Sequence, residues 1–234
     1  MAQQRTLTAR TILNSLAARL TVFTTLVSTY VWAFWFNSRT IGYVAEIKDK
    51  ATAVSAGTSI AAITVSVFFV IVYLILLNHR LEVQNDRIAP MWCRVSAFAI
   101  DFWFALFTLS SLSALIPLVS EAERTGAFNW HFQRDYAVPA DGFGAVLVLG
   151  CLCALVAYFV LPLMRGGQTV GGWILHLATV NADGYVIHLP LSGALRRIWW
   201  EFRGLCSPIK SLKKRDSEGR TFYDIESGFT VIRY

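Results

Sequence analysis

Two stretches of the chain carry no charged residue over more than twenty positions, and they limit the folds that it can adopt. Residues 56–77 (AGTSIAAITVSVFFVIVYLILL) and 143–164 (FGAVLVLGCLCALVAYFVLPLM) are each 22 residues long. A helix needs about 20 apolar residues to cross the hydrocarbon layer of a bilayer. Only 15% of the 234 residues are charged, whereas soluble domains average about 25%. We therefore expect a membrane protein.

Two further stretches are predicted to span the membrane although each contains a charge. Residues 12–36 contain Arg19 near their start, where a long side chain can reach the headgroups. Residues 95–119 contain Asp101 in an otherwise apolar run. A signal peptide is the alternative for residues 12–36, but their apolar core is too long and no clear cleavage site follows. The expected class is an all-α polytopic membrane protein with four transmembrane helices.

The distribution of Lys and Arg predicts the orientation of these helices. Sixteen of the 21 Lys and Arg residues lie in residues 1–19, 78–94 and 165–234, and five lie in the loops 37–55 and 121–142. The positive-inside rule then places both termini and the middle loop on the cytoplasmic side of the cell membrane. Because the basic residues flank spans and no binding motif accompanies them, we expect no nucleic-acid partner.

The cytoplasmic tail, residues 165–234, has signs of a small sheet. Asp183 and Gly184 separate two β-prone runs in LATVNADGYVIHL, which predicts a β-hairpin. The segment GFTVIRY, residues 228–234, is also strand-like and can add a third strand. The glycine-rich segment RGGQTVGGW, residues 165–173, lacks the ending of a phosphate loop and is interpreted as a turn that packs closely against a helix or headgroup.

Residues 192–206 are predicted to form an amphipathic helix with Ser192 as its N-cap. One arc is apolar and comprises Leu195, Ile198, Trp199, Phe202, Leu205 and Cys206, whereas Arg196, Arg197, Glu201 and Arg203 lie outside it. Such a helix can lie in the plane of the headgroups, or it can pack on the sheet or on a partner protein. The candidates for binding anionic lipid or a partner are Arg196, Arg197, Arg203, Lys210, Lys213, Lys214 and Arg215. The last four can equally form a solvated loop.

The part of the chain from about residue 89 to the end resembles the RDD family, which is named for one arginine and two aspartates. Arg94 and Asp101 have the family's Arg-x6-Asp spacing, and Asp224 stands in its closing element. The other matching residues follow in the family's order: Gly167, Thr169 and Gly171, then Gly184, then Ala194, Leu195 and Arg197, and last Gly228. The resemblance implies an RDD-like domain over residues 89–234, with spans at about 95–119 and 143–164. Residues 1–88, with spans at about 12–36 and 56–77, form a separate helix pair.

The chain departs from the family pattern at two places. Phe229 stands where the family usually has Thr, and Thr230 follows one position later. Gly172 stands where Lys is common, and Arg165 can take over a headgroup or partner contact of that Lys. The family has no settled activity, and the suggested transport of an unidentified ligand rests on analogy.

Asp101 is costly to place in hydrocarbon and therefore needs an explanation. It lies two helical turns from Arg94, about 10 Å along the axis, which is too far for a direct ion pair. It can pair as an ion with a basic residue such as Arg19 or Arg197, be protonated, or line an ion path. The preferred interpretation is a carboxylate that bonds an arginine or backbone N–H groups and fixes helix packing. Asp224 is interpreted as a helix cap or as a partner for Arg94 or Arg197.

No constellation of catalytic side chains is legible in the sequence, so we do not expect an enzyme. The four cysteines and four histidines show no ligand spacing, and neither a metal nor a cofactor is expected. Two functions stay open. The first is a non-catalytic accessory or interaction subunit whose basic cytoplasmic face binds a partner protein, a second copy or anionic lipid. The alternative is a small ion or solute transporter that uses Asp101.

Overall fold

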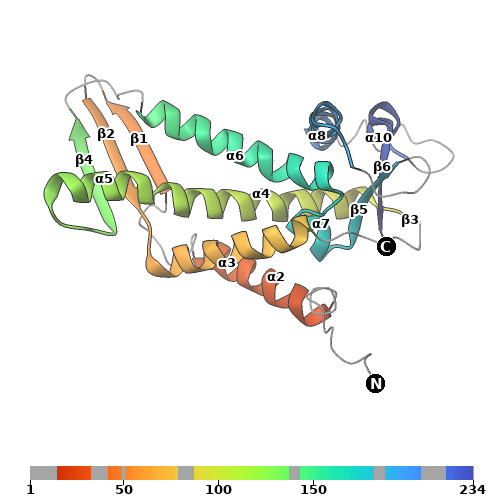
Figure 1. Cartoon of the computed structure of the whole chain (residues 1–234), viewed down its shortest axis with the longest axis horizontal. Coiled ribbons are helices and arrows are strands. Elements are labelled where there is room, and N and C mark those ends of the chain that lie inside the picture. Colours follow the sequence, from red (N-terminus) through yellow and green to blue (C-terminus); the bar gives the residue numbers. More distant parts are fainter. Residues whose placement is uncertain are drawn as a thin grey trace. The chain divides into compact units, whose positions relative to one another are not determined.

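The structure is a computed structural model that describes residues 15–32, 42–48, 51–78, 87–136, 143–181, 188–206 and 220–233. The chain divides into two compact units. Unit 1 comprises residues 1–27, 73–102 and 158–234, and unit 2 comprises residues 28–72 and 103–157. Four long helices contribute residues to both units: α2 (Leu16–Val31), α3 (Ile60–Leu77), α4 (Met91–Ser113) and α6 (Phe143–Arg165), labelled in Figure 1.

Three of the apolar helices are long enough to cross a membrane. They are Ile60–Leu77, Met91–Thr125 and Ala145–Arg165. The second combines α4 with α5 (Leu115–Thr125), which ends at Gly126 in the left-handed conformation at φ 73°. Helix α2 is apolar over Leu16–Thr29 and is shorter. The chain is thus a membrane protein with three candidate spans and one shorter apolar helix, and the ends of the predicted first span lie outside the described residues.

The long helices expose apolar side chains that water would disfavour. On α6, Val146, Leu149 and Leu152 are 70%, 62% and 53% exposed. On α3, Val67 and Ile71 are also about half exposed. Exposed apolar area costs about 25 cal/mol per Å² in water, and large contiguous patches mark membrane or protein contacts. These faces fit a lipid environment.

Unit 1 contains a three-stranded antiparallel sheet. Its order is β3 (Arg87–Ile88), β6 (Phe229–Arg233) and β5 (Leu177–Asn181). The predicted terminal strand is therefore present, and it is the central strand. Strand β5 pairs with β6, in the register Thr179 to Val231. The pairing of β5 with the run after Gly184, in the predicted hairpin, stays a prediction. Residues 182–187 of that hairpin lie outside the described residues.

Short helices surround this sheet in unit 1: α7 (Val170–Ile174), α8 (Leu191–Cys206) and α10 (Phe222–Ser227). Two small cores hold them. One joins the start of α4 to the sheet through Ala89, Cys93, Ala97, Leu177 and Val231. The other joins the end of α6 to α8 through Val160, Leu189 and Ala194.

Helix α8 occupies the predicted range, but its details differ from the prediction in two respects. It begins at Leu191, so Ser192 lies in its first turn and is not the N-cap. Of the predicted apolar arc, Leu195, Trp199 and Phe202 are 43%, 62% and 52% exposed, and Ile198 packs against a core of unit 1. Arg197, assigned to the polar face, is only 2% exposed. Periodicity identified an amphipathic helix but not the side on which the protein lies.

Unit 2 contains a second sheet that the sequence did not predict. Strands β1 (Gly42–Lys48), β2 (Ala51–Gly57) and β4 (His131–Tyr136) pair antiparallel in that order. Residues 56 and 57 belong to β2, and α3 begins at Ile60, so the predicted span at 56–77 starts too early. The sequence of β2 is rich in Ala and uncharged, so it could not be distinguished from the start of the apolar run that follows it. The all-α class is therefore corrected to a mostly helical protein with two three-stranded sheets.

Aromatic side chains pack the helices of unit 2. Phe69 on α3 lies against Phe104 and Phe107 on α4, with ring centroids 4.8 and 6.2 Å apart. Phe69, Phe104 and Phe107 are all buried. Ring pairs at such distances stabilise a contact by about 0.5–1.5 kcal/mol beyond their burial.

Candidate functional site

Arg94 and Asp224 form a buried ion pair between the first turn of α4 and the short helix α10. Nη1 of Arg94 donates to both carboxylate oxygens of Asp224, at 2.9 Å to Oδ1 and 2.8 Å to Oδ2. The side chains are 7% and 1% exposed. Ion pairs removed from water need additional hydrogen bonds to offset the loss of hydration. The surroundings of this pair supply them.

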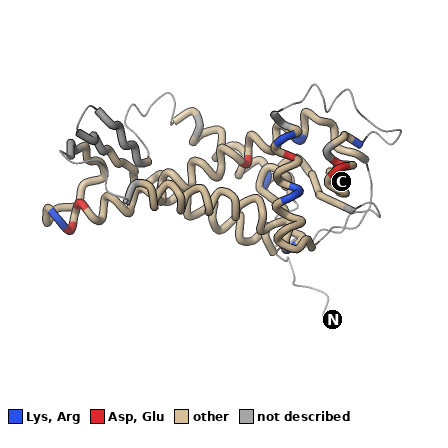
Figure 2. Tube along the Cα trace, turned by 90° about the horizontal axis from the view of Figure 1, so that it is seen from above, with Lys and Arg blue, Asp and Glu red and all other residues tan. Residues whose placement is uncertain are grey.

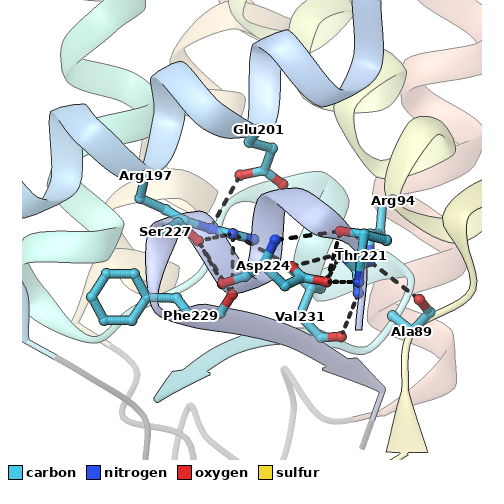
Figure 3. A network of polar contacts seen from close by, with 9 residues as sticks. All are labelled: Ala89, Arg94, Arg197, Glu201, Thr221, Asp224, Ser227, Phe229 and Val231. Carbon is cyan, nitrogen blue, oxygen red and sulfur yellow. Dashed lines mark hydrogen bonds and ion pairs between the residues drawn. The ribbon is translucent and has the colours of Figure 1, made fainter. Parts of the chain in front are cut away.

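Arg197 on α8 is the second arginine at the same carboxylate. Figure 3 shows Asp224 between the two guanidinium groups. Nη1 of Arg197 lies 3.5 Å from Oδ1 of Asp224 and donates to the Ser227 hydroxyl at 2.8 Å and to the Phe229 carbonyl at 3.3 Å. Asp224 thus holds α4 and α8 to the segment that begins β6.

Asp224 also caps its own helix. Its Oδ2 accepts from the Thr221 backbone N–H at 3.0 Å and from the Thr221 hydroxyl at 2.9 Å. The Thr221 side chain accepts from the Asp224 backbone N–H in return, which completes a capping box. The α10 helix ends at Gly228 in the left-handed conformation at φ 76°. The cap orients the carboxylate so that it can meet both arginines.

Arg94 fixes more than the carboxylate. Its Nε donates to the Ala89 carbonyl at 3.1 Å, and its Nη2 donates to the Val231 carbonyl at 3.2 Å. A planar guanidinium with five donors suits several acceptors at fixed angles. One side chain therefore joins α4, α10 and the central strand β6.

A small pocket borders this network and is lined by Met91, Arg94, Arg197, Glu201, Gly204, Thr221 and Asp224. Its volume of about 20 Å³ holds roughly one water molecule. Glu201 is the second acid here, with Oε2 3.9 Å from Nε of Arg197. Two arginines and two acids balance the formal charge. This network, Arg94, Arg197, Glu201, Thr221, Asp224 and Ser227, is called the arginine–aspartate network below.

Asp101 lies apart from the arginine–aspartate network and is held by uncharged donors. Its Oδ1 accepts from the Tyr158 hydroxyl at 2.6 Å and from the Gly171 backbone N–H at 2.6 Å. The Asp101 residue is 3% exposed. Among the described residues no ion pair of Asp101 occurs, which speaks against the alternative in which it pairs with Arg19 or Arg197. The preferred interpretation, a carboxylate bonded by backbone N–H that joins helices, agrees with these contacts.

The glycine-rich segment is shaped by close backbone approach. A Cβ on Gly171 would lie 2.1 Å from the Ala97 carbonyl oxygen, and one on Gly167 would lie 2.7 Å from the Leu77 carbonyl oxygen. Neither position has room for a side chain. The hydroxyl of Thr169 between them accepts from the Gly172 backbone N–H at 3.2 Å and caps α7. The segment is therefore a tight turn packed against the ends of helices.

A third polar contact joins α2 to the turn after α7. Nη1 of Arg19 lies 2.8 Å from Nδ1 of His176, and its guanidinium lies 5.7 Å from the Trp173 ring centroid. Burial lowers the pKa of His176, and the charges of Arg19 and Arg233 lower it further. The neutral imidazole accepts the Arg19 hydrogen bond. This contact connects residues 1–88 to the RDD-like part of the chain.

The remaining predicted residues fall into two groups. Arg196 and Arg203 are exposed on α8, and Arg203 lies over the Trp200 ring at 5.2 Å. Gly184, Lys210, Lys213, Lys214 and Arg215 lie outside the described residues. Among the side chains that the structure describes, every Lys and Arg other than Arg124 belongs to unit 1, and Figure 2 shows these charges in blue.

Sequence reasoning missed Tyr158, Thr221 and Ser227. A signal existed for Thr221, because Thr-x-x-Asp before a short helical segment resembles a capping box. Tyr158 gave no signal, since a tyrosine in an apolar span is common at a membrane boundary. Its role at Asp101 depends on the packing of α6 against α4.

Apolar helices of membrane-spanning length, joined at a charged end by buried arginine and aspartate side chains, define a multi-pass membrane protein with a polar cap. The RDD family model matches residues 88–229, and the chain belongs to the RDD family. The match contains Arg94, Asp101 and Asp224 together with the glycine-rich segment. Comparisons with curated proteins and with solved structures give no match.

Proposed function

We propose that this RDD family protein is a non-catalytic membrane subunit that binds through its basic face. One observation supports the proposal most. Arg94, Asp101 and Asp224 are 8%, 3% and 2% exposed, and each is bonded to groups of the chain itself. A catalytic acid or arginine must reach a substrate, and these side chains instead hold helices together. In this proposal Arg94, Asp101 and Asp224 stabilise the fold and do not bind a substrate.

The binding surface in this proposal is the exposed basic part of unit 1. Arg196 and Arg203 on α8 lie on its surface, and the cluster from Lys210 to Arg215 follows α8 in the sequence. A basic surface next to a membrane attracts anionic lipid at about 1 kcal/mol per Lys or Arg, and it attracts acidic proteins by the same charge. A partner protein, a second copy of the chain and anionic lipid are the ligands of this class.

The orientation belongs to the same proposal. Four spans, with α2 extended at both ends, would place both termini and the basic face of unit 1 in the cytoplasm of the cell. The bias of Lys and Arg toward residues 1–19, 78–94 and 165–234 supports this arrangement.

A small ion or solute transporter that uses Asp101 is the second candidate. Its support is that Asp101 lies inside a candidate span and is bonded by a hydroxyl and an amide rather than by an arginine. Acids within spans often mark ion paths. Against this function, Asp101 is 3% exposed, and its Oδ1 already accepts two hydrogen bonds from the chain itself.

Photo-crosslinking and ion flux together test the proposal. A benzophenone side chain replaces Arg196 in native membranes, and the same group replaces Val146 on the apolar face of α6 as the control. A discrete protein or phospholipid adduct at 196, with no cation flux in proteoliposomes, is the expected result. Flux that Asp101→Asn abolishes, without an adduct at 196, would instead establish the transporter.

A further inference from the structure

The exposed face of α8 carries a continuous apolar stripe. Leu191, Leu195, Trp199 and Phe202 follow one another at helical spacing and are 55%, 43%, 62% and 52% exposed. At 100° per residue the last three lie roughly 140–200° around the helix from Arg197. Arg197 faces the arginine–aspartate network, so the stripe points away from the protein. Four large apolar side chains exposed on one face of a helix indicate a contact with lipid or with another protein.

The opposite face of α8 is firmly attached to unit 1. Ala194 and Arg197 are 0% and 2% exposed, and Arg196 on the flank donates to the Glu226 carbonyl at 3.0 Å. The helix therefore cannot turn its stripe inward without breaking the buried contacts of Arg197. The stripe is fixed on the surface by the same arginine that holds Asp224.

The position of α8 along α6 gives its depth. The Leu189 backbone N–H, just before α8, donates to the Leu163 carbonyl in the last turn of α6 at 3.0 Å. Helix α6 is a candidate span that ends at Arg165, so its last turn lies near the headgroups. In Figure 3, α8 is the blue helix that carries Arg197, and it runs across the direction of α4, the yellow helix that carries Arg94. A helix at the end of a span and across its direction lies along the membrane surface.

The polar residues beside the stripe match a lipid headgroup layer. Arg196 and Arg203 lie on one flank of it, roughly 100–120° from Arg197. Trp92, in the first turn of α4, is 63% exposed and belongs to the same unit. Tryptophan side chains gather at the level of the headgroups, where a ring can be partly apolar and partly wet. The apolar stripe, the arginines beside it and the exposed Trp92 and Trp199 are the side chains expected where acyl chains meet lipid headgroups.

We propose that α8 lies in the headgroup layer of an anionic membrane, with Leu195, Trp199 and Phe202 in the acyl boundary and Arg196 and Arg203 on lipid phosphates. The proposal rests on the proposed function and commits it to lipid at this face. Amphipathic helices with this pattern bury their apolar face about 5–10 Å into the boundary. The attachment of α8 to the last turn of a candidate span and the exposed arginines beside the stripe favour lipid over a protein partner.

Site-directed spin labelling measures the depth of each position directly. Labels at 195, 199 and 202, in the full chain with its native cysteines replaced by alanine, are read in nanodiscs of phosphatidylcholine with phosphatidylglycerol. Val156 on α6 and Glu226 on α10, both exposed, are the lipid and water controls. At the stripe we expect oxygen access above nickel-chelate access, as at 156, and the reverse at 226.

Two outcomes would overturn the proposal. Nickel-chelate access at the stripe equal to that at 226 would place α8 in water, and labels closed to both reagents would show that protein covers it. Either result leaves the proposed function standing if a protein adduct forms at position 196. Conversely, a stripe in lipid combined with Asp101-dependent flux would contradict the proposed function alone.

The wild-type chain gives a second measurement if the cysteine replacements prevent folding. Brominated phosphatidylcholine quenches tryptophan fluorescence near the acyl boundary, and Trp199→Phe should lower the quenched fraction. The exposed Trp130 in unit 2 provides the matched variant, Trp130→Phe. Arg196→Gln with Arg203→Gln should reduce quenching at Trp199 only when phosphatidylglycerol is present. Equal quenching in wild type and Trp199→Phe contradicts the proposal, and a charge effect independent of phosphatidylglycerol contradicts its phosphate contacts.

Discussion

The two buried aspartates, Asp101 and Asp224, differ in what they bond. Asp224 lies between two arginines, whereas Asp101 is bonded by a tyrosine hydroxyl and a backbone amide. Removing a carboxylate therefore has different consequences at the two positions. Around Asp224 two buried positive charges lose their partner, and around Asp101 two neutral donors lose theirs.

Asp224→Ala is expected to lower the free energy of unfolding by about 3–5 kcal/mol, the usual cost of leaving a buried charge unpaired. Thermal unfolding of the purified protein in mild detergent measures the change. Arg196→Gln is the control, because this exposed arginine only reaches a carbonyl of α10. Equal melting temperatures for Asp224→Ala and wild type would show that the arginines do not depend on Asp224.

Asp101→Asn keeps one acceptor oxygen, so its expected cost is about 1–2 kcal/mol, the difference between charged and neutral hydrogen bonds. Asp101→Ala removes the acceptor of the Tyr158 O–H and of the Gly171 N–H, at roughly 1–3 kcal/mol for each lost hydrogen bond. The melting temperature is therefore expected to be highest for the wild type, lower for Asp101→Asn and lowest for Asp101→Ala. If Asp101→Asn is as stable as the wild type but loses ion flux, the result favours the transporter function.

His176 makes the contact between α2 and the turn after α7 sensitive to acid. Its pKa is lowered chiefly by burial and then by Arg19 and Arg233, so the folded chain favours the neutral ring. The resulting stabilisation is present above the unfolded pKa of about 6.5 and is lost as the pH falls through the lower folded pKa.

The expected result is a melting temperature that falls between pH 7.5 and pH 5 and falls less in His176→Gln. Glutamine retains an acceptor for Arg19 but takes up no proton. His188→Gln, at an exposed position, is the matched control and should follow wild type. If the melting temperatures of both variants fall as much as that of the wild type, a group other than His176 causes the acid sensitivity.

At the scale of elements, the glycine-rich segment sets how closely α7 approaches α4. The Gly171 N–H reaches Asp101 at 2.6 Å only because no Cβ separates α7 from the Ala97 carbonyl. One glycine thus permits both the close packing and the hydrogen bond. The pattern Gly-x-Thr-x-Gly describes a backbone approach and a helix cap, not a ligand loop.

Gly171→Ala is expected to destabilise the protein by about 1–3 kcal/mol, because the added methyl group forces the helices apart. Gly150→Ala is the contrasting control. It lies within α6 with open space around its Cβ position, and alanine favours a helix by up to about 1 kcal/mol there. Opposite shifts in melting temperature are expected, and a neutral Gly171→Ala would mean that α7 moves away at no cost.

Some elements could be predicted from the sequence because their signal is local. Helix α6, helix α8 and strand β6 follow from apolar length, periodicity and β-propensity. The register of β5 on β6, about fifty residues away, could not be predicted, because no local pattern specifies such pairing. Helical angles placed Arg197 on the polar face, which is correct for the helix alone, but in a membrane protein the polar face can be the one that faces the protein.

At the scale of the whole molecule, the charges divide the chain in a way that predicts its orientation. The described Lys and Arg side chains other than Arg124 belong to unit 1. The positive-inside rule acts through such residues near span ends. Unit 1 is therefore the part that should face the cytoplasm.

Reporter fusions test this orientation. A phosphatase that is active only outside the cytoplasm should be inactive when fused after Tyr234 and active when inserted in the loop near Gly126. A fluorescent protein that folds only in the cytoplasm should give the reverse pattern. Phosphatase activity after Tyr234 would contradict the orientation, and activity at both sites would contradict a single crossing by α6 between Gly126 and Tyr234.

The distance along the chain between Arg94 and Asp224 has a consequence for biogenesis. The two residues are 130 positions apart, and Asp224 follows all the candidate spans. During translation, α4 and α6 can enter the bilayer while Arg94 and Arg197 still have no carboxylate between them. The late arrival of α10 completes the network, so in a chain that stalls before Thr221 both arginines lack Asp224, and Glu201 is the one acid of the network already made.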